Sequence, residues 1–312
     1  TRANETFLLC STYPRLLATP KIITDEDLFE IAKFRSKQRI PVLTWINPDT
    51  QAAIVRCAQP LVGLAAHHSD ADENLFKTIA RSNPCASGIL VADARPYANA
   101  IANKGRKGGF EDVSKYEDSN TELIFLNIDN IHVMRRSLQE MHELVRAPDR
   151  TQPAKLSDVL ATGWLSFVGR LLGGAATMVE TVSTQKRTVI VHCSDGWDRT
   201  AQLSGLAQLC LDPYYRTCKG FQVLFQKEWL GFGHKCRDRT WGHKLHERSP
   251  IMMQFLDAVH QVMHTFPEAF EFNELLLIKV VDSLVTNSYS DFRFNNERER
   301  LESLHGTASA PG

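Results

Sequence analysis

The clearest pattern of apolar and polar positions lies between residues 188 and 211. An apolar, β-branched run at 189–191 leads into a short polar stretch that contains Gly196. After this stretch, Leu203 and Leu206 begin a series of apolar residues that are spaced three and four positions apart. Such runs are typical of buried strands, and such spacing is typical of amphipathic helices. The pattern therefore predicts a strand, a loop and a helix, in that order.

The same two patterns recur along the rest of the chain. Short apolar runs predict further strands at residues 40–45, 52–55, 88–92 and 122–128. Spaced apolar positions predict helices at residues 24–37, 72–82, 134–145, 165–179, 221–229, 251–262 and 277–284. Because strands alternate with helices, we expect an α/β fold. We expect one domain over residues 1–312, with an extended N-terminal segment at 1–24 and a frayed tail at 296–312.

Three groups of basic residues stand out along the chain. Residues 97–117 are polar and rich in glycine, lysine and arginine, which indicates a mobile basic loop. Residues 231–244 form a second basic group. Each of these stretches is either solvated surface or a binding site for additional phosphate groups. Arg35, Lys37 and Arg39 make up the third group, which we expect to be a solvated face.

The composition allows a large core but gives no general preference for a charged partner. The chain has 312 residues, 43% of them apolar, and its 36 basic residues are balanced by 36 acidic ones. A chain of this length buries a substantial core. Its balanced charge provides no overall field to attract nucleic acid, so we expect no nucleic-acid partner. Any preference for phosphate or lipid has to come from local groups of residues.

The cysteines argue against a metal site and against a disulfide framework. There are seven of them, an odd number, and no two form a C-x-x-C pair. We therefore expect no metal, no other cofactor and a reducing, cytosolic setting. The longest apolar stretch, residues 164–182, contains Arg170 and several glycines, so we do not expect it to span a membrane. Because the chain opens at Thr1 rather than at methionine, we expect it to be a piece of a longer protein.

The predicted loop between residues 193 and 199 has the features of a phosphate site. Backbone N–H groups converge where such a loop meets a helix, and the helix dipole adds positive charge at the same point. Arg199 would hold two phosphate oxygens with its planar guanidinium. The same field would lower the pKa of the Cys193 thiol, which makes it a nucleophile at neutral pH.

A second pair of residues with the same spacing serves as a comparison. Cys210 and Arg216 are also six positions apart, but their stretch contains no glycine. It carries Pro213 and two tyrosines where backbone donors would have to converge. Cys210 also lies where a predicted helix ends, whereas Cys193 ends a predicted strand. We therefore interpret the second pair as a coincidence and Cys193 as the candidate nucleophile.

The stretch HCSDGWDRTAQ, residues 192–202, resembles the signature loop of the myotubularin phosphoinositide 3-phosphatases. Asp195 and Asp198 distinguish it from the usual loop of protein tyrosine phosphatases, which carries small residues and glycine in their place. The resemblance extends along nearly the whole chain, through FRSKQRIPVLTW (34–45), QPLVG (59–63), DARP (93–96), ANKGRKGGFE (102–111), NIHVMRRSL (130–138), YYRTCKGFQVLFQKEWLGFGHK (214–235) and FPEAFEFNE (266–274).

This resemblance implies a fold, a substrate class and a set of binding residues. The fold would be that of the cysteine-dependent protein tyrosine phosphatases, a central mixed sheet flanked by helices. The substrates would be phosphatidylinositol 3-phosphate and phosphatidylinositol 3,5-bisphosphate, hydrolysed at the 3-position. Residues expected at the substrate are Asn103, Asn130, Ile131, Ser194, Gly196, Trp197, Thr200, Lys235 and Arg239. Lys235 departs from the arginine of some family members, which replaces a planar fork with a point charge for the 5-phosphate.

The resemblance also implies where and with which partners the protein works. It would be cytoplasmic and would bind peripherally to endosomal or other membranes that contain phosphoinositides. Homo-oligomers, or hetero-oligomers with other myotubularins, would form through regions outside this chain.

The expected reaction needs a nucleophile, a clamp for the phosphate oxygens and an acid for the leaving group. Cys193 would attack phosphorus, Arg199 and the loop amides would hold the oxygens, and the Thr200 hydroxyl would support the thiolate. No tryptophan is followed by Pro-Asp, so the separate acid loop of related tyrosine phosphatases is missing from the sequence. The acid therefore has to come from another place.

We expect Asp198 to be that acid, with Asp195 as a second acid or a contact to the inositol ring. Two carboxylates beside a phosphate dianion repel it and each other, which would raise the pKa of at least one of them. The alternative is that both carboxylates only hold backbone N–H groups of the loop.

Two other functions fit the sequence less well. A phosphotyrosine protein phosphatase would be better served by a remote acid loop, which we do not find. A phosphoinositide-binding adaptor with weak or no activity would typically have lost the cysteine or the arginine. Cys193 and Arg199 are both present.

Overall fold

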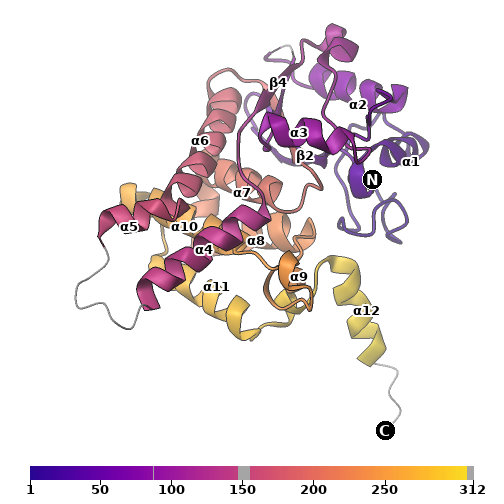
Figure 1. The fold of residues 1–312 in the computed structure, drawn as a ribbon. Helices are drawn as coiled ribbons and strands as arrows, with labels where there is room; N and C mark the ends of the chain where they lie inside the picture. Colours follow the sequence, from indigo (N-terminus) through magenta and orange to yellow (C-terminus); the bar gives the residue numbers. More distant parts are fainter. Residues whose placement is uncertain (87, 147–154, 308–312) are drawn as a thin grey trace.

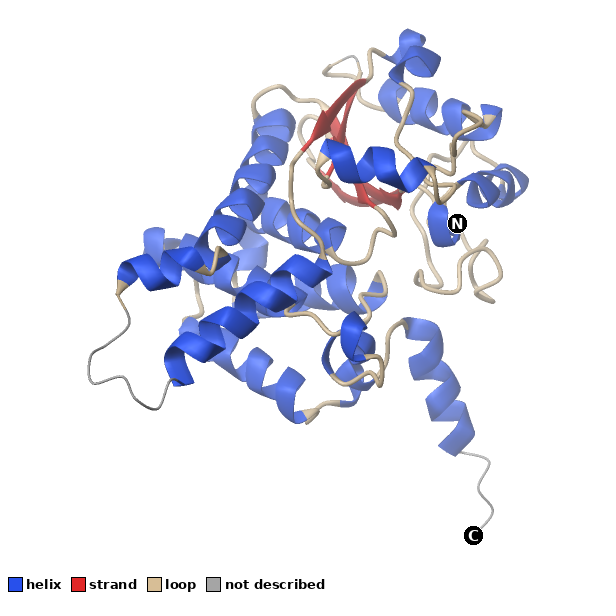
Figure 2. Ribbon diagram, viewed as in Figure 1, coloured by secondary structure: helices blue, strands red, loops and turns tan. Residues whose placement is uncertain are grey.

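The computed structural model describes residues 1–86, 88–146 and 155–307. At its centre is a five-stranded sheet with the strand order β1-β2-β5-β3-β4. The strands are β1 (Val42–Ile46), β2 (Ala53–Ala58), β3 (Ile89–Asp93), β4 (Glu122–Phe125) and β5 (Thr188–Cys193). Strand β1 is antiparallel to β2, and the other neighbouring strands are parallel. The prediction of a mixed sheet flanked by helices is therefore confirmed (Figure 1, Figure 2).

Strand β5 lies in the middle of the sheet and is buried along its whole length. Its side chains alternate between two hydrophobic cores, since Val189 and Val191 belong to one core and Ile190 belongs to the other. Cys193 is in phase with Val189 and lies on the first side. The apolar run is continuous because a strand that is covered on both faces has no polar side.

Helices cover both faces of the sheet (Figure 1). The first core contains residues of α6 (Trp164–Ser183), α7 (Arg199–Leu211) and α10 (Ile251–Thr265). The second core contains residues of α1 (Asp25–Phe34) and α2 (Asp70–Arg81), together with Leu9, Tyr13 and Leu17 from the N-terminal segment. Residues 1–24 contain no helix or strand, but they pack into the second core. This segment is therefore part of the folded body.

The remaining helices are α3 (Tyr97–Lys104), α4 (Ile131–Arg146), α5 (Leu156–Ala161), α8 (Cys218–Phe225), α9 (Cys236–Thr240), α11 (Glu274–Thr286) and α12 (Glu297–Thr307). A π-helical turn at Gln226–Gly231 follows α8. Within the described ranges, none of the helices has both the length and the apolar character that crossing a bilayer would require.

Two segments differ from the prediction. Helix α3 occupies the first part of residues 97–117, where we predicted a mobile loop, because the glycines follow this alanine-rich helix and do not interrupt it. Helix α12 replaces the frayed tail as far as Thr307. The Asn296 side chain accepts the N–H of Glu299, and Arg300 donates to the carbonyl of Leu230, so this helix is capped and anchored. Residues 308–312 of the predicted tail lie outside the described residues, as do residues 147–154.

The basic group around residue 37 is not a solvated face. Arg35 and Arg39 are 1% and 0% exposed, and of the three cations only Lys37 reaches solvent. The Arg35 guanidinium pairs with Asp72 and Glu111 and donates to the backbone at Ala58. Arg39 donates instead to backbone carbonyls, including that of Phe232. The prediction was wrong because the partners of both arginines come from distant parts of the chain, which a local charge pattern cannot show.

Candidate active site

The loop that joins β5 to α7 runs from Ser194 to Asp198, at the carboxyl end of the central strand. Gly196 has a φ of +77°, and a Cβ atom there would lie 2.3 Å from the carbonyl oxygen of Cys57. Only glycine fits this turn, because the loop passes so closely over β2. Helix α7 begins directly afterwards at Arg199, so its N-terminus faces the loop as predicted.

Cys193 ends β5, with a side chain that is almost fully buried. The N–H of Gly196 and the hydroxyl of Thr200 each lie 3.3 Å from its sulfur atom. Burial raises the pKa of this thiol, but the nearby Arg199 charge and these two donors lower it by more. The resulting pKa is below that of an ordinary cysteine, so the site favours the thiolate.

The loop also offers free hydrogen-bond donors. In the part of the chain that the structure describes, the backbone N–H groups of Asp195, Trp197 and Asp198 have no protein acceptor. Arg199 donates from Nη1 to the carbonyl of Ile128 at 3.2 Å, which fixes its side chain. A thiolate, amide donors and a guanidinium therefore lie together, and phosphate is the ligand whose charge and geometry match them.

A cavity of about 800 Å³ opens over this loop. The predicted site residues that line it are Cys193, Ser194, Asp195, Trp197, Asp198, Arg199, Asn103, Asn130, Ile131, Lys235 and Arg239. They come from the end of β5, the loop, the first residue of α7, helix α3, the start of α4 with the residue before it, and α9 with the residue before it. The two other predicted residues do not line the cavity. Gly196 turns its carbonyl towards buried arginines, and Thr200 is fully buried against the sulfur of Cys193.

Further residues line the cavity that we did not predict as site residues. They are Ser36, Lys37, Gln59, Arg95, Asn99, Ala102, Arg106, His132 and Glu247. Lys37 and Arg106 add positive charge to the cavity. Both lie in stretches through which the family resemblance extends, and this was the signal that could have identified them.

Two buried ion pairs support the loop from the neighbouring strand ends. Arg95 pairs with Asp93 at 2.6 Å and also donates to the carbonyl of Gly109 at 2.7 Å. His192 Nε2 lies 2.9 Å from a carboxylate oxygen of Glu111. Burial lowers the pKa of His192, but the Glu111 carboxylate raises it by more, so the charged pair is favoured. The first pair fixes the end of β3, and the second fixes His192, the residue before Cys193.

Asp198 is tightly paired. Its carboxylate accepts bonds from Arg239 Nε at 3.0 Å and Nη2 at 2.8 Å, and His234 Nδ1 lies 3.3 Å away. Burial raises the pKa of Asp198, but Arg239 and His234 lower it by more, and the result lies far below the usual range. The expectation of a raised pKa is therefore wrong for Asp198. Its partner lies 41 positions further along the chain, beyond the reach of a local pattern.

Asp195 has a different environment. It is partly exposed in the cavity and accepts a hydrogen bond from the Ser36 hydroxyl at 2.9 Å. Within the described residues, neither Asp195 nor Asp198 accepts a bond from an N–H group of the loop. The structure therefore gives no support to the alternative that both carboxylates only brace the loop backbone.

Cys210 and Arg216 form no comparable site. Cys210 is exposed near the end of α7, and Arg216 donates to the carbonyls of Leu209 and Cys210 at 2.7 and 3.0 Å. Arg216 thus satisfies carbonyl groups at the end of a helix. This confirms that the second pair with the same spacing is a coincidence.

One group among the described residues has the ligand types for a metal ion. His68, Asp70 and Glu73 at the start of α2 each offer one ligand atom, and these atoms lie within 4.8 Å of one another. None of the three lines the cavity, so an ion bound there would lie outside the candidate active site.

Replacing Thr200 with valine should raise the pKa of Cys193. Valine has a similar shape but cannot donate a hydrogen bond, so the thiolate loses one of its stabilising partners. Alkylation of Cys193 by iodoacetamide should therefore begin at a higher pH than in the wild type. Cys193→Ser identifies the signal of this residue among the seven cysteines. An unchanged pH profile would show that the hydroxyl does not stabilise the thiolate.

Replacing Arg239 with methionine should destabilise the fold by about 3 kcal/mol, because the buried Asp198 carboxylate loses its main partner. The pKa of Asp198 is lower in the folded state than in the unfolded state, where it is about 4. The stabilisation from the ion pair is therefore complete above about pH 4 and is lost as the pH falls further. Urea denaturation should show a difference between variant and wild type that shrinks on acidification.

The control for this experiment is Arg237→Met. Arg237 is on the same helix, but its side chain is 47% exposed, so its ion pairs with Asp238 and Glu299 are largely screened by solvent. Its loss should cost less than about 1 kcal/mol. Equal losses for the two variants, or a loss for Arg239→Met that does not depend on pH, would contradict the importance of the buried pair.

Comparison with known proteins places this site in a family. A family model described as a myotubularin-like phosphatase domain matches residues 1–301. A cattle protein (Bos taurus) named phosphatidylinositol-3,5-bisphosphate 3-phosphatase MTMR2 is 48% identical over an alignment of 304 residues, which covers 96% of this chain and 47% of that protein. Myotubularin of Xenopus tropicalis is 46% identical over an alignment of 319 residues, gaps included, which covers 98% of this chain and 52% of that protein. The chain thus spans about half the length of these relatives.

Solved structures show a weaker likeness. The crystal structure of a kinase associated phosphatase, with its catalytic cysteine replaced by serine, is 10% identical and has a TM-score of 0.35. The likeness covers 74% of this chain and 98% of that one. The family match covers almost all of this chain, including the loop with Cys193 and Arg199. The chain therefore belongs to the family of myotubularin-like phosphatase domains.

Proposed function

We propose that this chain is a cysteine-dependent phosphatase that removes the 3-phosphate from phosphatidylinositol 3-phosphate and phosphatidylinositol 3,5-bisphosphate. The observation that carries the proposal is the cavity in which the Cys193 thiol, with its lowered pKa, meets Arg199 and the free loop amides. The name of the cattle relative, a 3-phosphatase of phosphatidylinositol 3,5-bisphosphate, supports the substrate class.

The proposed reaction has two steps. In the first, the Cys193 thiolate attacks phosphorus, a sulfur–phosphorus bond forms, and the bond from phosphorus to the inositol oxygen breaks. The departing oxygen takes a proton from an aspartic acid, while Arg199 and the loop N–H groups hold the phosphoryl oxygens. In the second step, water attacks the cysteinyl-phosphate and gives its proton to the aspartate. Phosphate leaves, and the thiolate is restored.

The proton donor of the first step is one of the two aspartates in the cavity. Arg239 holds Asp198 as a carboxylate, which suits the base of the second step but requires proton uptake before the first. Asp195 is open to the cavity and is bonded to the hydroxyl of Ser36. Both lie in the same cavity as Cys193, so each is in a position for the role.

Additional cations in the cavity match a headgroup with more than one phosphate. Lys235 lies at the start of α9, with its ammonium group 4.6 Å above the ring of Trp197. Arg106 lines the same cavity. Arg239, which we expected at the headgroup, also lines it, but its guanidinium is bonded to carboxylates. Lys235 lies 3.5 Å from Asp238, but this pair is partly exposed and is therefore weaker than the buried pairs of Arg239. We therefore propose Lys235 and Arg106 as the first contacts of a second phosphate group.

The proposed substrate is a lipid, so the chain is proposed to act on membrane surfaces. We propose peripheral binding, from the cytoplasm, to endosomal or other membranes that contain phosphoinositides. Targeting to these membranes and association with other myotubularins are proposed to depend on regions outside this chain.

Phosphate release from short-chain phosphoinositides tests the function. The wild type should act on the 3-phosphate and the 3,5-bisphosphate, and Cys193→Ser should lose a factor on the order of 10⁴ or more because it removes the nucleophile. Cys210→Ser, at the coincidental second pair, is the control and should keep full activity. Equal turnover of the 4- or 5-monophosphates would contradict the proposed position. Faster turnover of a phosphotyrosine peptide would indicate a protein phosphatase, and no release at all would indicate an adaptor.

Two substrates with different leaving groups identify the proton donor. Asp198→Asn and Asp195→Asn should be compared on short-chain phosphatidylinositol 3-phosphate and on p-nitrophenyl phosphate, whose leaving group needs no proton. The variant that removes the donor should lose about 10²- to 10⁴-fold on the lipid and far less on the aryl phosphate. Equal losses on the two substrates for both variants would exclude each aspartate from this role.

A further inference from the structure

Two buried arginines meet at one backbone oxygen of the loop. Arg39 Nη2 donates to the carbonyl of Gly196 at 2.9 Å, and Arg56 Nη2 donates to the same oxygen at 3.0 Å. Both arginines are 0% exposed. A single neutral donor would satisfy a buried carbonyl, so two charged donors exceed what the backbone needs.

Arg39 is held in place from three sides. It follows a turn in which Lys37 and Gln38 both have a φ of +55°. Its guanidinium also donates to the carbonyl of Phe232 at 2.7 Å and to the Thr12 hydroxyl at 3.0 Å. The ring of Tyr13 lies beneath it at 4.2 Å. In the described residues no carboxylate pairs with Arg39, so its positive charge stays uncompensated next to the loop.

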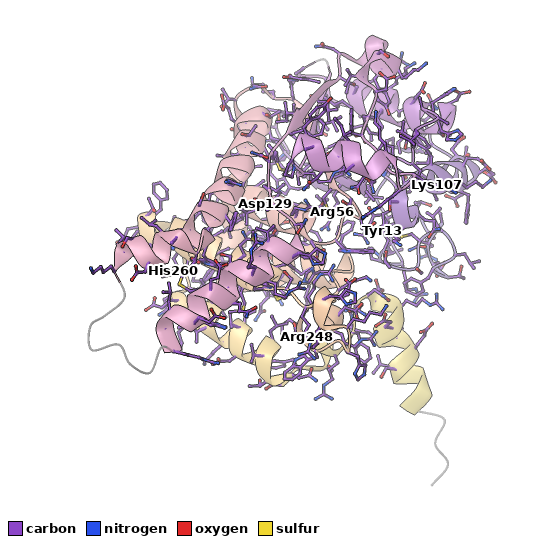
Figure 3. The ribbon with its side chains drawn as sticks, in the orientation of Figure 1. Tyr13, Arg56, Lys107, Asp129, Arg248 and His260 are labelled. Atoms are coloured by element: carbon purple, nitrogen blue, oxygen red, sulfur yellow. The ribbon has the colours of Figure 1, made fainter. Side chains whose placement is uncertain are left out.

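Arg56 has one acidic partner. Its Nη1 donates to the carboxylate of Glu228 at 2.7 Å and to the carbonyl of the same residue at 2.8 Å. The ring of Phe232 lies 4.4 Å from the guanidinium carbon. Figure 3 labels Arg56 and Tyr13 close together near the centre of the molecule, and the Tyr13 hydroxyl bonds to the backbone of Arg56. The N-terminal segment and the second core thus meet at this point.

We propose that Arg39 and Arg56 are positioning residues, which fix the Gly196–Trp197 peptide so that its N–H group faces the bound phosphate. The inference rests on the proposed phosphatase function and names two residues that serve it without touching substrate. The peptide bond is trans, so the N–H of Trp197 points away from the Gly196 carbonyl. The arginines lie on the buried side, whereas Trp197 lines the cavity.

The arginines would also make this amide a stronger donor. A carbonyl that accepts charged hydrogen bonds polarises its peptide unit, which strengthens the N–H on the opposite side. The Trp197 N–H has no acceptor within the described part of the protein, so this polarisation is available to a ligand. The uncompensated charge of Arg39 adds a favourable potential for a phosphate dianion, because it acts through the low-dielectric interior.

Tungstate, a tetrahedral dianion, is the probe for the test. Tryptophan labelled with ¹⁵N gives backbone signals from the five tryptophans, and Trp197→Phe identifies the signal of residue 197. In the wild type, tungstate should shift the Trp197 amide downfield by more than the other four. Calorimetry should show about tenfold weaker tungstate binding by Arg39→Lys and by Arg56→Lys, because lysine cannot bridge the same acceptors. In Arg39→Lys the Trp197 shift should also be smaller.

The control is Arg216→Lys. Arg216 also donates to two backbone carbonyls, those of Leu209 and Cys210, but these lie at the opposite end of α7 from the loop. This variant should bind tungstate within about twofold of the wild type, even where it is less stable. If one lysine variant fails to fold, the affinity and the Trp197 shift of the other decide the question. If both fail, Thr12→Val, which removes the hydroxyl that accepts from Arg39, takes their place and should reduce the Trp197 shift.

The outcomes separate this inference from the proposed function. A Trp197 amide that does not move when tungstate binds would overturn the inference, as would unchanged affinity in Arg39→Lys. Failure of the wild type to bind tungstate would overturn it too. If the wild type binds tungstate with the expected Trp197 shift but releases no phosphate from any lipid, the proposed function fails while the inference stands.

Discussion

The rest of the site depends on one interaction, the stabilisation of the Cys193 thiolate at the buried end of a central strand. A buried anion without partners would be costly. Here the Gly196 N–H, the Thr200 hydroxyl and the Arg199 charge offset the burial, and the pKa of the thiol falls below that of an ordinary cysteine. The electrostatic field that stabilises the sulfur anion also favours a phosphate group, so one arrangement of donors serves both the thiolate and the ligand.

Local patterns were enough to predict the strand, loop and helix around Cys193, because periodicity is a property of neighbouring positions. The placement of Cys193 and Arg199 at the two ends of this loop could also be predicted, since a polar stretch with a glycine between a strand and a helix indicates a loop that leads to the helix N-terminus. Most of the candidate site beyond the loop came from the resemblance. Asn103, Asn130 and Lys235 have no local pattern of their own, yet all three line the cavity.

Pairing between distant residues could not be predicted in this way. Arg35 and Arg39 flank a short polar stretch that contains Lys37, which is typical of a surface, but both are buried. Asp72 and Glu111 neutralise Arg35, and only the tertiary fold brings them to it. The same reason explains Asp198, whose pKa depends on Arg239 from another helix. The charges of Arg35 and Asp198 are stabilised by partners that only the tertiary fold brings close.

The phase of strand β5 has a consequence for how the chain can vary. Val189, Val191 and Cys193 share one face, while Ile190 faces the core around Tyr13. Because strand side chains alternate, an inserted or deleted residue between Thr188 and Cys193 would turn the sulfur into the opposite core, away from the start of α7. Exchange of one β-branched residue for another preserves this parity, but a change in strand length does not. The position of the proposed nucleophile therefore depends on the length of the strand as well as on the residue type.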